Sequence, residues 1–313
     1  MSALFNVILP VFLVIGFGYL ASWRGLFSES AVDGLMRFAQ NFAVPVLLFQ
    51  SIATLDLGAE FNLPMLAAFY IGALIAFAVG WLGALWLGRN PEEAVAIGFV
   101  CLFSNSLLLG IPITERAYGA SALAGNFMII ALHSPLLYTF GITFMEFTRA
   151  RGQSVPMGRV ALRALTGVIR TPLVIGILAG FVMNVLTEAG LVLPEGFWGA
   201  VGMLARAALP AALFGLGGVL FRYRPQGDAS AIAMCCAVSL ILHPAITIGL
   251  GYAFGLDAAA MRSAVMTAAM PAGVNAYLFA NIYGVARRVA ATSVLMATAL
   301  SVLSIWMWLE ILP

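Results

Sequence analysis

Two long apolar segments of the chain contain residues that an uninterrupted membrane helix tolerates poorly. In the first, residues 104 to 119, three such residues (Asn105, Gly110 and Pro112) fall near the middle of the apolar run. Proline removes a backbone donor, and glycine costs about 1 kcal/mol relative to alanine inside a helix. Backbone groups freed in lipid cost several kcal/mol unless a partner satisfies them. The segment is therefore predicted to break, at a place that protein or a water-filled cavity covers.

The second segment repeats this pattern further along the chain. Residues 269 to 284 contain Pro271, Gly273 and Asn275, and they end in Tyr-Gly as the first segment does. The second Tyr-Gly pair follows the first by 165 residues. Two interrupted helices at matching positions of two halves are a strong indication of a transporter's substrate site.

The composition places nearly the whole chain in a membrane. Of its 313 residues, 63% are hydrophobic and only 9% are charged, which is more apolar surface than a soluble protein of this size can bury. We predict one all-α integral domain over residues 1–313 with ten membrane spans. The spans are expected at about 4–22, 32–54, 63–87, 94–119, 121–147, 168–187, 197–220, 229–254, 259–284 and 286–310.

Arginines predict the orientation of these spans, because cytoplasmic loops are enriched in positive charge. All basic residues are arginine, and 12 of the 15 lie in or beside odd-numbered loops. The second and sixth loops carry acidic residues and no arginine. Odd-numbered loops are therefore expected in the cytoplasm, and both termini outside.

The two halves of the chain also share a second landmark. Pro45 in span 2 and Pro210 in span 7 sit in similar apolar runs, again 165 residues apart. Because each repeat has an odd number of spans, the second copy is inverted. We predict two inverted five-helix repeats, over residues 1–150 and 165–313, with helices 4 and 9 broken and crossing, an architecture suited to alternating access.

At such a crossing, helix N-termini would present unpaired N–H groups and about half a positive charge, which suits an anion such as a carboxylate. Neutral donors gather at the breaks, and no acidic residue lies in the middle of a span, where a cation carrier would need one. The two asparagines could instead be interhelical hydrogen-bonding residues. The predicted substrate-binding residues are Ser104, Asn105, Ser106, Gly110, Pro112, Pro271, Gly273, Val274 and Asn275, with Gln50 and Ser51 beside Pro45 as possible cavity-lining groups.

Three stretches resemble the auxin efflux carrier family, which contains plant PIN carriers and bacterial permeases. They are residues 44–51, residues 103–112 with the Tyr-Gly pair at 118–119, and residues 270–277 with the pair at 283–284. The similarity extends over essentially the whole chain. It implies a ten-helix fold with a scaffold part and a transport part, crossing helices 4 and 9, and homodimers in a bacterial cytoplasmic (inner) membrane. It also implies small organic anions as substrates, such as malate, malonate or auxin-like acids.

Four classes of function remain to be weighed on the sequence. A secondary carrier of small carboxylates is favoured, and a sodium-coupled organic-anion symporter resembling the bile-acid family is the alternative. No phosphate-binding G-x-x-x-x-G-K-S/T loop is present, so no nucleotide cofactor is expected. An enzyme would need paired acids, a metal cluster or an activated nucleophile, and neither these nor a nucleic-acid partner is expected. A passive channel fits paired breaks and inverted repeats less well.

Overall fold

The structure is a computed structural model that describes residues 3–55, 61–150, 162, 166–167 and 169–313. The described residues form helices joined by turns, and one isolated β-bridge. Within these described ranges, six helical stretches could cross a membrane by length and composition, and the apolar helix Pro172–Glu188 is shorter. The six are Leu4–Trp23, Leu63–Trp86, Ala120–Arg149, Glu195–Arg222, Ala229–Ala253 and Arg287–Ile311.

The chain divides into two compact units, and each takes segments from both halves of the sequence. Unit 1 comprises residues 1–9, 62–165 and 223–313, and unit 2 comprises residues 10–61 and 166–222. All the predicted break residues of spans 4 and 9 therefore belong to unit 1.

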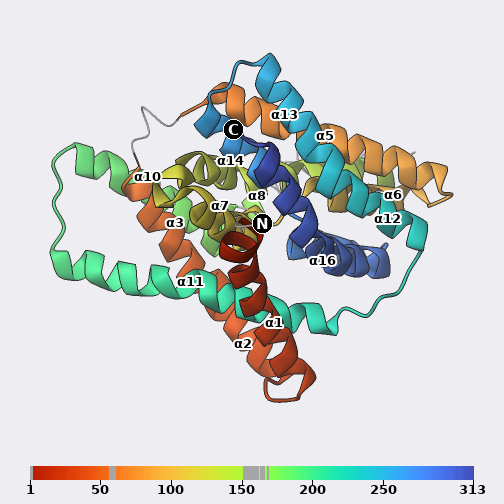
Figure 1. Cartoon of the computed structure of the whole chain (residues 1–313), viewed down its shortest axis with the longest axis horizontal. Coiled ribbons are helices and arrows are strands. Elements are labelled where there is room, and N and C mark those ends of the chain that lie inside the picture. Colours follow the sequence, from red (N-terminus) through yellow and green to blue (C-terminus); the bar gives the residue numbers. More distant parts are fainter. Residues whose placement is uncertain (1–2, 56–60, 151–161, 163–165, 168) are drawn as a thin grey trace. The chain divides into compact units, whose positions relative to one another are not determined.

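Unit 2 is organised around α3, which packs against α10 and α11 (Figure 1). The contact with α10 is close, because a Cβ added to Gly176 would lie 2.4 Å from the carbonyl oxygen of Pro45. Asn184 of α10 donates to the carbonyls of Ile52 at 3.0 Å and Leu55 at 2.7 Å, which covers the C-terminal end of α3. The helices of this unit are α1 (Leu9–Trp23), α2 (Glu29–Phe38), the π-helix η2 (Ala39–Ala43), α3 (Val44–Ala53), α10 (Pro172–Glu188) and α11 (Glu195–Arg222).

Unit 1 contains the other helices described here, and among them α5 and α6 pack extensively against each other. Its elements are η1 (Leu4–Ile8), α5 (Leu63–Trp86), α6 (Pro91–Leu102), η3 (Ser106–Gly110), α7 (Ile111–Tyr118), η4 (Ala120–Leu123), α8 (Ala124–Arg149), α12 (Ala229–Ala237), η5 (Val238–Leu242), α13 (His243–Ala253), α14 (Ala258–Ala268), α15 (Val274–Tyr283) and α16 (Arg287–Ile311). Of these, η1, η3 and η5 are π-helices and η4 is a 3-10 helix.

Each π-helix ends two residues before a proline. The prolines are Pro10 after η1, Pro45 after η2, Pro112 after η3 and Pro244 after η5. In a regular α-helix the proline ring clashes with the carbonyl one turn earlier and removes its donor. A π-turn inserts an extra residue at that place, so the helix continues through the proline.

Candidate functional site

The first predicted break lies between α6 and η3. The α-helix ends at Leu102, and the next residues leave helical geometry, with Phe103 at φ −93°, ψ 89° and Asn105 at φ −79°, ψ 53°. The second half of the segment then begins at Ser106 with the π-helix η3. The expectation that Gly110 and Pro112 also interrupt the segment is wrong, because Gly110 is helical at φ −62°, ψ −48°, and the π-turn admits Pro112 as the second residue of α7.

The second break separates α14 from α15 and is paired with the first through the backbone. Asn105 N–H donates to the carbonyl of Pro271, and Gly273 N–H donates to the carbonyl of Phe103, each at 2.8 Å. Ser104 and Ala272 thereby form an antiparallel bridge. The N–H groups freed at one break thus bind carbonyl groups freed at the other. Such mutual hydrogen bonding is the condition for irregular structure inside a membrane.

The helices that begin at the two breaks, η3 and α15, start with backbone N–H groups that have no acceptor in the described part of the chain; we call these the inner helix starts. No side chain caps η3 or α15. Among the described residues, no acceptor is found for the N–H groups of residues 106–108 or of residues 274 and 275. Each start therefore presents two or three unfilled N–H groups and the partial positive charge of a helix N-terminus.

The polar side chains at the first break are buried and only partly satisfied. Asn105 is 7% exposed, and neither its Nδ2 nor the Oγ of Ser104 has a hydrogen-bond partner among the described residues. The hydroxyl of Ser106 donates to the carbonyl of Ser104 at 3.4 Å. An amide donor without an acceptor is costly in a dry site, so a ligand with an acceptor oxygen would relieve it.

Some of the other predicted residues lie at the breaks, and others do not. Pro271 and Gly273 form the backbone pairing, and Val274 and Asn275 begin α15 with half-buried side chains. Gly110 lies near the second break, since a Cβ on it would be 3.4 Å from Met270. Gln50 and Ser51 lie on α3 in unit 2, so they belong to a separate unit from the break residues.

The comparisons with known proteins place the chain in a family. The model of the family described as "Membrane transport protein" matches residues 3–309. The chain belongs to this family. It is 27% identical to the "Putative malonate transporter" of Rhizobium meliloti, over 97% of this chain and 94% of that protein. It is 23% identical to "Auxin efflux carrier component 8" of Arabidopsis thaliana, over 91% of each chain. An "Uncharacterized transporter" of Methanothermobacter thermautotrophicus is 24% identical over 98% of each.

The resemblance to auxin efflux carriers predicted from the motifs is thus confirmed. The chain is an integral membrane protein of a transport family, whose function implies a small-molecule substrate. In this family member, no carboxylate side chain is buried among the described residues. The same residues contain no group of three or more His, Cys, Asp or Glu side chains that could hold a metal ion.

Sequence reasoning missed a buried polar cluster that ties the two broken segments together. Asn126 of α8 donates to Thr267 of α14 at 2.9 Å and to Thr114 of α7 at 3.4 Å. All three side chains are fully buried. The cluster therefore joins the second half of one segment to the first half of the other. A lone asparagine in an apolar span was the available signal for it.

A second contact from α8 was also missed. The hydroxyl of Tyr138 donates to the carbonyl of Asn275 at 3.0 Å, in the first turn of α15. Its ring packs against the rings of Phe99, Phe103 and Phe279, with centroids 5.4 to 6.4 Å away. Tyr138 therefore positions α15 relative to the end of α6.

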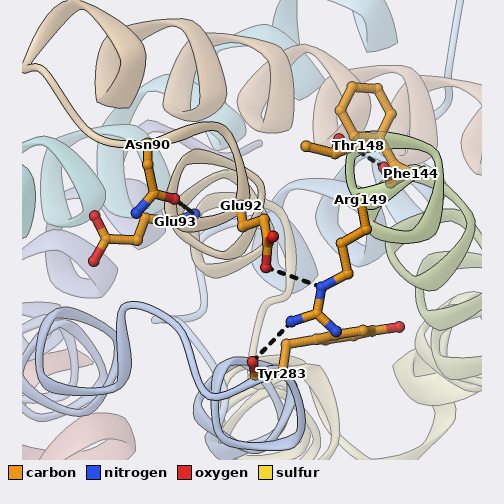
Figure 2. Close-up of polar contacts among 7 residues, drawn as sticks. All are labelled: Asn90, Glu92, Glu93, Phe144, Thr148, Arg149 and Tyr283. Carbon is orange, nitrogen blue, oxygen red and sulfur yellow. Dashed lines mark hydrogen bonds and ion pairs between the residues drawn. The ribbon is translucent and has the colours of Figure 1, made fainter. Parts of the chain in front are cut away.

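Arginines hold the outer ends of the two segments. Arg149, at the end of α8, binds Glu92 in the first turn of α6 at 2.9 Å and donates to the carbonyl of Tyr283, at the end of α15, at 3.0 Å (Figure 2). Arg262 of α14 lies over the ring of Tyr118, at the end of α7. The start of each segment thus lies beside the end of the other, so the two run in opposite directions.

Proposed function

We propose that the protein is a secondary active carrier of small organic anions, which binds them at the paired breaks and moves them by alternating access. The observation that carries this proposal is the pair of uncapped helix starts, η3 and α15, joined by one antiparallel bridge beside the unsatisfied amide of Asn105. Free N–H groups, a helix dipole and a neutral amide favour a carboxylate and offer little to a cation.

We further propose that the two segments are crossing helices 4 and 9 of a ten-helix, inverted-repeat fold. Their opposite directions and the arginine contacts at their outer ends support this arrangement. The proposal includes a homodimer in a bacterial inner membrane, with both termini outside. In this arrangement Arg149 lies on the cytoplasmic side, in agreement with the distribution of arginine along the sequence.

The donors and the names of the relatives support the proposed substrate class. Mono- or dicarboxylates such as malate, malonate or auxin-like acids are the proposed cargo, since one relative is named for malonate and another for auxin, which is also a carboxylic acid. The proposed contacts are the backbone N–H groups at residues 106–108 and 274–275, with the amides of Asn105 and Asn275. The remaining predicted site residues of unit 1, Ser104, Gly110 and Pro112 among them, would line the path.

The test is uptake of radiolabelled malonate, malate and indole-acetate into proteoliposomes. Asn275→Asp should abolish uptake, because a carboxylate at the start of α15 repels the anion and competes for the free N–H groups. Asn281→Asp is the matched control, since Asn281 is exposed on the same helix two turns later, and it should transport normally. Equal uptake by the two variants would contradict the proposed site.

The same vesicles test the energy source. Proton and sodium gradients are imposed separately, at zero membrane potential, with malonate or whichever acid is taken up. Uptake driven by a proton gradient supports a proton-coupled carrier. Uptake that strictly requires sodium would favour the symporter alternative. Uptake that no gradient can concentrate would contradict secondary active transport and identify a passive pathway.

A further inference from the structure

Unit 1 contains an open apolar groove that the proposed transport site does not use. Residues of α12 and η5 line one side of it and residues of α16 line the other. The helices α12 and α16 pack against each other (Figure 1). Its volume is about 830 Å³, in the range of binding sites for drug-sized ligands. Most of its lining is aliphatic, with Thr292 and Ser304 among the few polar side chains.

The spacing of side chains explains why a groove forms here. Three alanines, Ala229, Ala233 and Ala237, recur every four residues on the lining face of α12, whereas α16 presents longer side chains such as Met296 and Met307. The indole Nε1 of Trp308 in α16 donates to the carbonyl of Leu240 in η5 at 2.9 Å, which ties these two elements together beside the groove. Short side chains on α12, next to helices that are held together, leave a channel between them.

Positive charge gathers at one end of this groove. The hydroxyl of Thr292 hydrogen-bonds the backbone of Gln226, donating to its carbonyl at 2.6 Å and accepting from its N–H at 3.0 Å. Gly227, at φ +119°, lies against the backbone of Arg288, where an added Cβ would be 3.5 Å from the carbonyl carbon. These contacts bring Arg224 and the pair Arg287–Arg288 to the end of the groove.

These three arginines, which we call the arginine rim (Arg224, Arg287 and Arg288), are exposed and unpaired. Among the described residues, none has a carboxylate within 4.0 Å or a hydrogen-bond partner for its guanidinium. The neighbouring carboxylate of Asp228 is already bound by Arg89 at 2.6 Å, and Glu93 lies 3.9 Å from the same arginine. The rim is therefore a local excess of positive charge.

We propose that the groove binds an anionic phospholipid, with its phosphate at the arginine rim and one acyl chain along α12 and α16. Apolar burial alone would not select a ligand in a bilayer, because lipid tails solvate any apolar surface. Selection comes from the charges, since each arginine near the headgroups contributes about 1 kcal/mol with anionic lipid. From Thr292 to Met307 the groove extends roughly 22 Å along α16, enough for one leaflet of a hydrocarbon core about 30 Å thick.

The test compares phosphatidylglycerol with phosphatidylcholine of the same acyl chains, titrated into the purified protein in a neutral detergent. Native mass spectrometry counts bound lipids, and a thermal melt reports the stabilisation that binding confers. Phosphatidylglycerol should bind roughly 100-fold more tightly, given three arginines at about 1 kcal/mol each. The triple variant Arg224→Gln, Arg287→Gln, Arg288→Gln should lose this preference.

A charge-matched control separates the rim from general surface electrostatics. Arg24→Gln, Arg37→Gln, Arg170→Gln removes three exposed arginines of unit 2, and it should keep the preference. Equal loss of preference in both triple variants would overturn the proposal. So would a rim variant that still prefers phosphatidylglycerol.

A second pair of variants tests the groove itself. Ala233→Trp fills it and should remove the tightly bound lipid, whereas Ala245→Trp, at an exposed position of α13 outside the lining, should not. Lipid binding that survives Ala233→Trp would overturn the assignment of the acyl chain to the groove. A wild-type dimer that carries no lipid and dissociates in Ala233→Trp would show that a second copy of the chain occupies the groove, and would also overturn it.

Discussion

Each broken segment contains two helix starts, one at its outer end and one at its inner end, and the two kinds of start are built differently. The outer starts are capped by side chains, with Asn90 accepting from Glu93 N–H at 2.9 Å in α6 and Asp257 accepting from Ala260 N–H at 2.8 Å in α14. The inner starts, η3 and α15, have no side-chain cap. At the inner starts the N-cap positions are held by Gly273, which has no side chain, and by Asn105, whose side chain makes no cap hydrogen bond although asparagine is a common capping residue.

This difference supports the proposed position of the ligand at the inner starts. A cap satisfies one of the open donors of a helix start and contributes about 1 kcal/mol. At the inner starts no side chain supplies this stabilisation, so a bound ligand is proposed to supply it. An anion that shuttles through the site would complete both starts when bound and leave them open when released. The predictions below either supply the missing cap, remove a donor, or remove an existing cap.

The largest expected effect comes from building a cap into an inner start. Gly273, the residue before α15, has φ −79° and ψ 158°, a conformation that suits a capping aspartate. An added Cβ would be no closer than 3.5 Å to Asn105 or Ser104, which is ordinary contact. Gly273→Asp should therefore fold, place its carboxylate where the substrate is proposed to bind, and reduce uptake into proteoliposomes to background.

Two further substitutions at this position control for side-chain size and charge. Gly273→Ala adds the same Cβ without a cap and should retain most of the uptake. Gly273→Ser adds a neutral cap and should fall between the two. A thermal melt of each variant confirms folding. Normal uptake by a folded Gly273→Asp variant would show that the start of α15 does not receive the anion.

The second effect concerns the unsatisfied amide at the other inner start. Asn105→Leu replaces a buried amide whose Nδ2 has no partner with an apolar side chain of similar volume. The melting temperature should stay equal or rise, because no hydrogen bond of that Nδ2 is lost. Transport should weaken about 10- to 100-fold, since a hydrogen bond to a charged ligand is worth about 1.5–3 kcal/mol.

The measurement is the concentration dependence of uptake together with the melting temperature. Asn281→Leu, at an exposed position of α15, is the control and should change neither. A fall in melting temperature with unchanged uptake would mean that Asn105 is a structural residue, which was the alternative interpretation of the sequence.

The contrast between outer and inner starts was partly predictable from the sequence. Pro271, Gly273 and the first-segment residue Asn105 stand where an apolar span should be regular, and the interruptions predicted from them are present, whereas Gly110 is helical. The local chemistry of one residue and its neighbours is enough for that inference. The uncapped start of α15 follows as well, because Gly273 has no side chain with which to cap. The uncapped start of η3 does not follow, because Asn105 at its N-cap position is a residue type that commonly caps helices.

The remaining features depend on contacts between distant parts of the chain. The backbone pairing of Asn105 with Pro271 joins residues far apart in the sequence, and no local pattern specifies it. The π-turn before Pro112 was missed because a proline clash can be relieved either by a break or by an inserted residue, and tertiary packing decides between them. Asn126 was missed because an isolated asparagine in a span gives no indication of its partners.

The third prediction concerns the stability that the hydrogen bonds of Asn126 give to the helices around the inner starts. Asn126→Ala removes the hydrogen bonds to Thr267 and Thr114 that join α14 and α7 through α8. The free energy of unfolding should fall by about 0.5–2 kcal/mol, the usual range for interhelical hydrogen bonds in membranes. Thr267→Val should cost less, because Asn126 keeps its bond to Thr114. Both are measured by denaturant unfolding in detergent, and an Asn126→Ala variant as stable as the wild type would contradict the positioning role.

The fourth prediction removes a cap at an outer start. Asn90→Ala should destabilise the protein by about 1 kcal/mol, since the N–H of Glu93 loses its acceptor. Because this start lies outside the proposed site, the apparent KM for uptake should not change. The same unfolding and uptake assays measure both quantities. A large rise in KM would remove the distinction between outer and inner starts on which the comparison depends.

The smallest expected effect is a pH dependence of the melting temperature. It concerns α12, a helix outside the two broken segments, whose start is also capped: the carboxylate of Asp228 accepts from the N–H of Ser230 at 2.8 Å. The hydrogen bond from Arg89 holds the pKa of the Asp228 carboxyl below its usual value of about 3.8, and the Ser230 N–H lowers it further. A carboxyl whose folded-state pKa is depressed stabilises the folded protein above the unfolded value, and that stability is lost as the pH falls through the folded value. The melting temperature in detergent should therefore decline slightly below about pH 4, and Asp228→Asn and Arg89→Gln should each reduce this decline. If the melting temperatures of both variants fall as steeply as that of the wild type, the acid sensitivity arises elsewhere in the protein. The charged cap Asp228 would then stabilise its helix no more than a neutral cap such as Asn90 does.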